Sequence, residues 1–196
     1  IDTSKVRFVY ASDYVNDANY WELVLKTSKA TSVARVKRAM DIMGRGEEEA
    51  EKDLSKLFYP AMQVSDIFYL QLDVAYGGTD QRHAHMLARD VAKKIGRTAP
   101  VAMHTPLLTS LQADGRMNPI EAKMSKSKPD TMISIHDPPD VVKKKLSKAY
   151  CPEKQIEGNP VLEVCKYVIF PDLEGKPFMI ERPEKFGGNL QFTSYE

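Results

Sequence analysis

The chain has 196 residues and a formal net charge of +1, with 42% hydrophobic and 28% charged residues, as in an ordinary globular protein. The near-zero total charge gives no electrostatic reason to expect nucleic acid as a partner, so any such contact must come from a local patch. No apolar run approaches the roughly 20 residues of a membrane-spanning helix, and the two cysteines are too few for a disulfide framework, so we expect a cytoplasmic protein without a membrane partner.

The first half of the chain is predicted to contain two strands and at least two helices. Residues 6–10 have the composition of a strand, and helices are expected over about residues 12–26 and 32–42. An acidic run at residues 47–51 is typical of a solvated helix start. At residues 70–74, leucine and valine alternate with polar side chains, which favours a second strand.

The second half continues the alternation of helices and strands. A helix is expected from residue 79 or 80 to Gly96, then a short strand at residues 100–103. Two further helices are expected over residues 137–150 and 159–169. Strands that alternate with helices of this length favour a parallel sheet with crossover helices, and ligands of such sheets bind at the carboxyl ends of the strands.

Two lysines and two serines occur together in the run Lys123-Met124-Ser125-Lys126-Ser127. Glycine and proline residues flank the run, which favours a mobile loop over a helix. Positive charge on a flexible loop suits the stabilisation of a departing pyrophosphate, because negative charge on the phosphates grows in the transition state. The alternative is a basic loop that is only solvated.

Three polar residues, Tyr59, Gln63 and Asp66, are spaced by four and three residues, so on a helix they share one face. Apolar residues surround them, and polar groups in such a setting need hydrogen-bond partners. A small ligand with a hydroxyl and an amino group could supply these partners, and Gln81 could join them across the turn at Gly77 and Gly78. The alternative is a helix edge whose polar residues face water.

The histidines do not form a recognisable metal site. His83 and His85 are two residues apart at a predicted helix start, so their side chains diverge. No cysteine or carboxylate completes a ligand set at known spacings, and we therefore expect no metal bound by the protein. For His104, at the end of a predicted strand, a structural role is favoured over contact with a nucleotide.

One predicted helix carries a strongly basic face, made by Lys143, Lys144, Lys145 and Lys148. Most such faces are only solvated. If the protein handles RNA, the same lysines could contact the phosphate backbone. The sequence leaves these two alternatives open.

Three segments occur in an order that resembles tyrosyl-tRNA synthetases of the archaeal and eukaryotic type, which are class I aminoacyl-tRNA synthetases. They are Tyr59-Pro-Ala-Met-Gln63-Val-Ser-Asp66, residues 73–82 and the lysine run 123–127, and residues 149–152, 157–160 and 182–188 also look like this family. The resemblance implies an α/β fold with an incomplete Rossmann-like parallel sheet and crossover helices, followed by the start of an α-helical domain. It places the second half of the catalytic domain, with its connecting segment, in residues 1–135, and linker helices with the start of an anticodon-binding domain in residues 136–196.

The same resemblance implies roles for single residues. Tyr59, Gln63 and Gln81 would hold the amino and carboxyl end of tyrosine, and Asp66 would accept a hydrogen bond from its phenolic hydroxyl. In the lysine run, Lys126 would contact the phosphates of ATP. The other implied residues of the ATP site and its loop are Lys123, Met124 and Ser125.

The implied reaction is attack of the tyrosine carboxylate on the α-phosphorus of ATP, with release of pyrophosphate and then transfer of the tyrosyl group to tRNA(Tyr). Positioning and charge stabilisation would provide the catalysis, with Mg²⁺ bound to the phosphates of ATP. Residues 32–43 correspond to the segment that forms the dimer interface in this family, so a homodimer is implied.

The family also uses a His-x-Gly-His element to bind ATP, and these 196 residues contain no such element. We therefore expect the chain to be an excerpt of a longer protein that does not adenylate tyrosine alone. Two alternatives remain: the tryptophan-specific sister synthetase, and a non-catalytic binding or signalling fragment. The position of Asp66 disfavours tryptophan, because an indole pocket does not need an acceptor in this arrangement.

Overall fold

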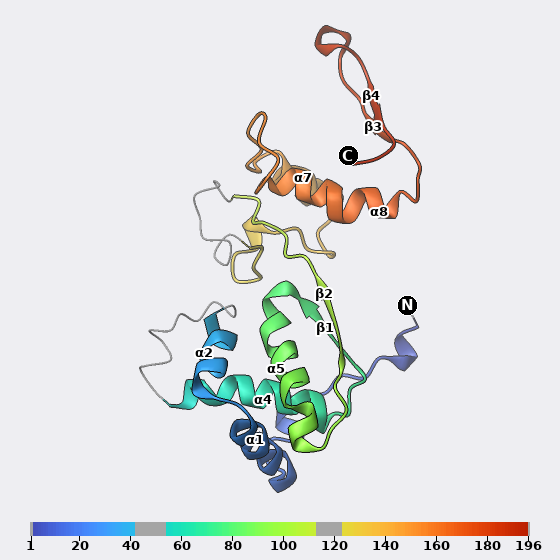
Figure 1. Ribbon diagram of the computed structural model, residues 1–196. Helices are drawn as coiled ribbons and strands as arrows, with labels where there is room; N and C mark the ends of the chain where they lie inside the picture. Colours follow the sequence, from blue (N-terminus) through green and yellow to red (C-terminus); the bar gives the residue numbers. More distant parts are fainter. Residues whose placement is uncertain (1, 42–53, 113–122, 196) are drawn as a thin grey trace. The chain divides into compact units, whose positions relative to one another are not determined.

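The computed structural model describes residues 2–41, 54–112 and 123–195 (Figure 1). The chain divides into two compact units, Ile1–Thr105 and Pro106–Glu196. The predicted acidic helix start at residues 47–51 lies outside the described residues. The predicted domain boundary at residue 135 concerns the longer protein of the family and stays a prediction.

Within residues 2–41 and 54–105, the first unit contains the α-helices α1 (Ala18–Ala30), α2 (Val33–Asp41), α4 (Ser55–Tyr69) and α5 (Arg82–Ala92) (Figure 1). Their apolar residues recur every three or four positions, which gives each helix one face that can be buried. These faces meet in a core whose buried members include Leu23, Ala39, Val64, Ile67, Phe68, Leu87, Ala88 and Val91. The sequence predicts a buried stripe of Ala84, Leu87, Ala88, Val91 and Ile95; the first four are buried on α5, whereas Ile95, in the 3-10 turn Lys93–Ile95 that follows, is partly buried.

The start of the chain differs from the prediction. Residues 6–10 are extended but pair with no strand among the described residues, and Phe8 is 82% exposed. A strand needs a hydrogen-bonded neighbour, which local composition does not reveal. Helix α1 begins after Asp17, whose side chain accepts a hydrogen bond from the Asn19 backbone N–H at 2.8 Å. This cap places the start of the helix later than the predicted residue 12.

Two parallel strands, β1 (Val74–Gly78) and β2 (Val101–Thr105), lie side by side with α5 between them in sequence (Figure 1). The register pairs Val74 with Val101 and Gly78 with Thr105. The prediction of an α/β fold with a parallel sheet and a crossover helix is therefore confirmed. The predicted strand at residues 70–74 was placed too early, because α4 continues to Tyr69 and Gln71 then turns the chain with a φ of 55°.

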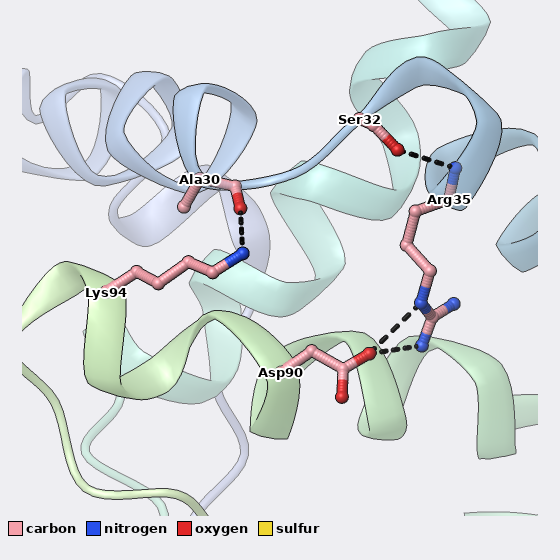
Figure 2. A network of polar contacts seen from close by, with 5 residues as sticks. All are labelled: Ala30, Ser32, Arg35, Asp90 and Lys94. Atoms are coloured by element: carbon pink, nitrogen blue, oxygen red, sulfur yellow. Dashed lines mark hydrogen bonds and ion pairs between the residues drawn. The ribbon is translucent and has the colours of Figure 1, made fainter.

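Polar contacts join α2 to α5, and α1 to the 3-10 turn Lys93–Ile95 that follows α5 (Figure 2). The guanidinium of Arg35 donates to Oδ2 of Asp90 from Nε at 3.0 Å and from a terminal nitrogen at 2.8 Å. Lys94 donates to the backbone carbonyl of Ala30 at 2.9 Å, which satisfies an acceptor at the last residue of α1. These contacts hold the helices that surround α4, the element that carries most of the candidate site.

The second unit contains the helices α6 (Pro139–Leu146), α7 (Pro160–Val164) and α8 (Phe170–Asp172), with a π-helical turn, Cys165–Ile169, before α8. Strands β3 (Phe178–Ile180) and β4 (Leu190–Phe192) form an antiparallel pair. Helix α6 is shorter than the predicted 137–150, because the backbone N–H of Tyr150 donates to the carbonyl of Leu111 at 2.7 Å rather than within a helix.

Within the described ranges, no helix is both long enough and apolar enough to cross a membrane.

Candidate active site

The predicted polar face of α4 is present, and it contacts the start of the next helix. Tyr59, Gln63 and Asp66 all lie on α4, and Gln81 ends the 3-10 turn Thr79–Gln81 that follows β1. Nε2 of Gln63 donates a hydrogen bond to Oε1 of Gln81 at 2.6 Å. The structure thus brings Gln63 and Gln81 together at the carboxyl end of β1, where open α/β sheets bind ligands.

Gln63 also presents an unused acceptor. Its Oε1 is buried and has no hydrogen-bond partner among the described residues. A buried carbonyl without a partner costs free energy, and a ligand that donates a hydrogen bond would remove that cost. An ammonium group, with three N–H donors and a positive charge, is well suited to this position.

Gly77 allows Gln81 to approach the strand closely. A Cβ at position 77 would lie 3.1 Å from Cγ and 3.3 Å from Cβ of Gln81. Both distances are shorter than ordinary carbon–carbon contacts, so a larger residue would push Gln81 away from Gln63. The predicted turn at Gly77 and Gly78 is in fact the end of β1, and the glycine serves packing rather than a turn.

Asp66 has two partners that the sequence did not reveal. Its Oδ1 accepts hydrogen bonds from the hydroxyls of Tyr14 at 3.0 Å and Tyr20 at 2.9 Å. Tyr14 precedes α1 and Tyr20 lies on its first turn, so both are distant from Asp66 in sequence. No local spacing links them to α4.

A pair of histidines lies beside Gly77. Nδ1 of His85 on α5 is 3.0 Å from Nε2 of His104 on β2. His85 is 5% exposed, and a Cβ at position 77 would lie 3.6 Å from its ring. Burial, and then the neighbouring His104, lowers the pKa of His85 below its usual 6.5. The structural role predicted for His104 is consistent with this pair, which no spacing in the sequence indicates.

We expect the first unit to lose stability below neutral pH because of His85. Because the pKa of His85 is lowered in the folded chain, the unfolded chain binds more protons than the folded chain once the pH falls to about 6.5. The free energy of unfolding therefore decreases as the pH falls below this value. Urea unfolding, followed by fluorescence of the single tryptophan Trp21, compares about pH 7.5 with about pH 5.5.

Replacement of His85 by glutamine should reduce this pH dependence and leave the part due to His83, whose pKa burial and then Arg35 lower in the same way. The same change at the exposed His136, in the second unit, should leave it unaltered. An unchanged pH dependence in the His85→Gln variant would contradict the assignment.

The lysine run lies in the second unit and is anchored at its first residues. Lys123 forms an isolated antiparallel bridge with Thr109, and the backbone N–H of Met124 donates to the carbonyl of Leu108 at 2.9 Å. Thr109 is itself held by Glu163 of α7, which accepts from its N–H at 2.7 Å and from its hydroxyl at 2.9 Å. The backbone at the start of the lysine run is therefore held in place by Leu108 and Thr109.

The rest of the run is an exposed turn, in agreement with the predicted loop. Ser125 and Ser127 share a hydrogen bond of 2.8 Å between their hydroxyls, and the Lys128 N–H donates to the Ser125 carbonyl at 3.0 Å. Lys126 is exposed at the tip of this turn. A cation on an exposed turn next to a fixed anchor can contact an anionic ligand.

The predicted basic face of α6 is partly engaged in an ion pair. On α6, Lys145 donates to Oδ2 of Asp137 at 2.7 Å, and this bond is the first cause of the lowered pKa of Asp137. Lys145 is thus part of an internal ion pair rather than of a free basic face. In the part of the chain that the structure describes, no group of three or more His, Cys, Asp or Glu residues could hold a metal ion.

Comparison with known proteins gives the family. A family model described as tRNA synthetases class I (W and Y) matches residues 1–195. The tyrosine–tRNA ligase of Sulfurisphaera tokodaii is 56% identical over 203 residues, which cover 100% of this chain and 56% of that protein. The tyrosine–tRNA ligase of Aeropyrum pernix is 53% identical over 205 residues, with the same two shares.

The fold agrees with a solved structure of the same kind. The crystal structure of tyrosyl-tRNA synthetase complexed with L-tyrosine from Pyrococcus horikoshii matches with a TM-score of 0.84 and 40% identity, over 99% of this chain and 57% of that one. The chain spans 56% of the length of the curated relatives named above. The predicted resemblance is confirmed: the chain belongs to the class I tRNA synthetases of the tryptophan and tyrosine group.

Proposed function

We propose that the chain is part of a tyrosine–tRNA ligase, which activates L-tyrosine with ATP and transfers the tyrosyl group to tRNA(Tyr). The names of relatives that are more than 50% identical over the whole chain support this proposal. The observation that carries it is the buried, unpartnered Oε1 of Gln63, because it requires a donor that the described residues do not supply.

The amino and carboxyl end of tyrosine binds at the pair formed by Gln63 and Gln81. The ammonium group donates to Oε1 of Gln63, and Gln81 is held in place by its 2.6 Å hydrogen bond from Gln63. Tyr59 lies one helical turn before Gln63 and contributes its hydroxyl to the same end of the ligand. Such neutral amides bind a zwitterion without an added charge of their own.

Asp66 binds the phenolic hydroxyl. It lies three residues after Gln63 on the same face of α4. A site whose acceptor awaits a hydroxyl rejects phenylalanine, because the acceptor then stays desolvated and unpaired. Tryptophan lacks a hydroxyl at this place, which disfavours the sister specificity.

The lysine run contacts ATP, which binds as its Mg²⁺ complex. Lys126 approaches the phosphates from the exposed turn, with Met124 and Ser125 in contact with the nucleotide, and the anchored Lys123 shapes the loop. The ammonium groups stabilise the negative charge that develops on the departing pyrophosphate. The metal ion comes with the substrate and adds positive charge at the phosphates.

The chemistry needs positioning rather than a general base. A carboxylate oxygen of tyrosine attacks the α-phosphorus, the bond from that phosphorus to the bridging oxygen breaks, and pyrophosphate leaves with the electron pair. A hydroxyl at the tRNA 3′ end then attacks the carbonyl carbon of tyrosyl-adenylate, and AMP leaves. Gln63, Gln81 and Asp66 fix the amino acid during both steps.

We also propose that residues 1–135 belong to the catalytic domain and that residues 136–196 start the anticodon-binding domain. We place the protein in the cytoplasm.

We propose in addition that the protein is a homodimer through the α2 segment. Val33 on α2 is 62% exposed and the nearby Leu54 is 70% exposed, and a second subunit would cover such apolar side chains. Sedimentation equilibrium of the full-length protein should give twice the mass of its single chain. A monomer at micromolar concentration would contradict this arrangement.

The function is tested with the full-length protein that carries this chain. Labelled pyrophosphate should exchange into ATP when tyrosine is present and not when tryptophan replaces it. Absence of exchange with tyrosine would overturn the proposed function, and exchange with tryptophan would establish the sister specificity. The 196-residue chain alone should not support exchange, because the family's His-x-Gly-His element is absent from it.

A further inference from the structure

The candidate specificity residue Asp66 is held by two phenols of the protein itself. The hydroxyls of Tyr14 and Tyr20 both donate to the same carboxylate oxygen, Oδ1, at 3.0 and 2.9 Å. The other oxygen, Oδ2, receives no hydrogen bond from the residues that the structure describes. An ionised carboxylate only accepts hydrogen bonds, so Oδ2 remains available to a third donor.

The two phenols are themselves fixed in an aromatic cluster of Tyr14, Tyr20 and Tyr69. Ring centroids are 5.1 Å apart for Tyr14 with Tyr20, 5.1 Å for Tyr14 with Tyr69, and 5.5 Å for Tyr20 with Tyr69. Tyr20 is only 2% exposed. Aromatic contacts at these distances restrict how far each ring can turn. The direction of the hydroxyls toward Asp66 is therefore set by packing.

The third member of the cluster serves a different acid. The hydroxyl of Tyr69 donates to Oδ2 of Asp17 at 2.6 Å, not to Asp66. Tyr69 thus offers a phenol–carboxylate hydrogen bond in the same cluster that should not influence Asp66 directly. This gives a matched control within the chain.

Both phenols that face Asp66 stay protonated over the working range of the enzyme. Burial, and then the hydrogen bond to Asp66, raises the pKa of Tyr14 to about 12, and the same two causes raise the pKa of Tyr20. They are therefore permanent donors, and Asp66 is the acceptor of both bonds.

We propose that Tyr14 is a specificity-determining positioning residue that, together with Tyr20, fixes the carboxylate of Asp66 so that Oδ2 faces the phenol of bound tyrosine. This role rests on the proposed function of the chain. Discrimination against phenylalanine needs an acceptor that cannot turn away to another partner when the ligand lacks a hydroxyl. Two hydrogen bonds on Oδ1 prevent that rotation, whereas a carboxylate held by one bond could turn.

The test compares tyrosine with phenylalanine in pyrophosphate exchange by the full-length protein. Tyr14→Phe keeps the ring and removes one hydroxyl, and the ratio of kcat/KM for tyrosine to that for phenylalanine should fall about tenfold, the effect of one hydrogen bond to a charged group. Tyr20→Phe should act in the same direction. Tyr69→Phe should leave the ratio unchanged.

A double-mutant cycle with Asp66→Ala separates positioning from general damage. If Tyr14 acts through Asp66, then Tyr14→Phe should alter the ratio by less than about twofold once Asp66 is gone. Thermal unfolding of each variant shows whether it is folded. If Tyr14→Phe is not folded, the same ratio measured for Tyr20→Phe tests the proposal.

Two results would overturn the role of Tyr14. An unchanged ratio, whether both kcat/KM values stay the same or fall by the same factor, would leave it structural, and an increased ratio would make its phenol a competitor of the substrate. Failure of the wild-type protein to use tyrosine would overturn the proposed function itself, and this role with it. The two failures are distinguished because the second appears without any substitution.

Discussion

Replacement of Asp66 by alanine in the full-length protein should lower kcat/KM for tyrosine by roughly 10- to 150-fold, as expected for loss of a hydrogen bond to a charged acceptor, while that for phenylalanine should not fall and should rise if the unpaired acceptor is what rejects it. The substitution removes the proposed acceptor of the substrate hydroxyl. Phenylalanine makes no such bond, so its transition state loses none. The measurement is pyrophosphate exchange with each amino acid at several concentrations.

Asp17 provides a control for this substitution. It is also a carboxylate that accepts a hydrogen bond from a tyrosine of the aromatic cluster, but its partner is Tyr69. It also caps α1, so Asp17→Ala should reduce stability, by about 1 kcal/mol for a lost cap, without changing the preference for tyrosine. Equal losses for tyrosine and phenylalanine in Asp66→Ala would contradict the role given to Asp66.

The parts of the fold that the sequence predicted are those set by local rules. The stripe of α5 was correct because burial follows the helical period, and Gly96 ends this segment in the left-handed conformation with a φ of 70°. The strand predicted at residues 70–74 was placed too early, because the backbone turns at Gln71. Gln71 adopts a left-handed φ of 55°, which few non-glycine residues do, and this moves the strand to Val74–Gly78.

In the candidate site, too, the contacts predicted from the sequence are those within one segment or near it. The spacing of Gln63 and Asp66 predicted a shared face of α4, and the expected approach of Gln81 is present as a 2.6 Å hydrogen bond. The contact of Asp66 with Tyr14 joins residues 52 positions apart, and the pair of His85 and His104 joins residues 19 apart. Such contacts depend on how helices and strands pack, so no pattern within one segment could predict them.

The lysine run 123–127 of the second unit takes its conformation from its anchor. The pairing of Lys123 with Thr109, which Glu163 holds in turn, fixes one end of the lysine run and leaves the turn around Lys126 exposed. The sequence predicted a mobile loop from its glycine and prolines, but it could not predict Glu163, which lies on α7 and is distant in sequence. The structure thus shows an anchored start and an exposed turn, and the assignment of Lys126 to ATP stays a proposal.

Lys126→Ala should reduce the rate of tyrosyl-adenylate formation by about 100- to 1000-fold, the range found when one donor to a developing negative charge is removed. The affinity for tyrosine should stay within about twofold, because the proposed function assigns Lys126 to the phosphates and Gln63 and Asp66 to the amino acid. Rapid-quench measurement of adenylate formation at saturating ATP gives the rate constant, and equilibrium dialysis with labelled tyrosine gives the affinity.

Lys128→Ala is the matched control for Lys126→Ala, because Lys128 is an exposed lysine of the same turn whose backbone N–H donates to Ser125. Loss of the charge of Lys128 should change the rate far less. A lysine that makes no contact with the phosphates acts on them only through long-range electrostatics, which salt screens, whereas a direct contact is screened much less. If both variants lose rate equally, the loop acts only through its total charge. A loss of tyrosine affinity in Lys126→Ala would instead place this lysine at the amino acid and contradict its assignment to ATP.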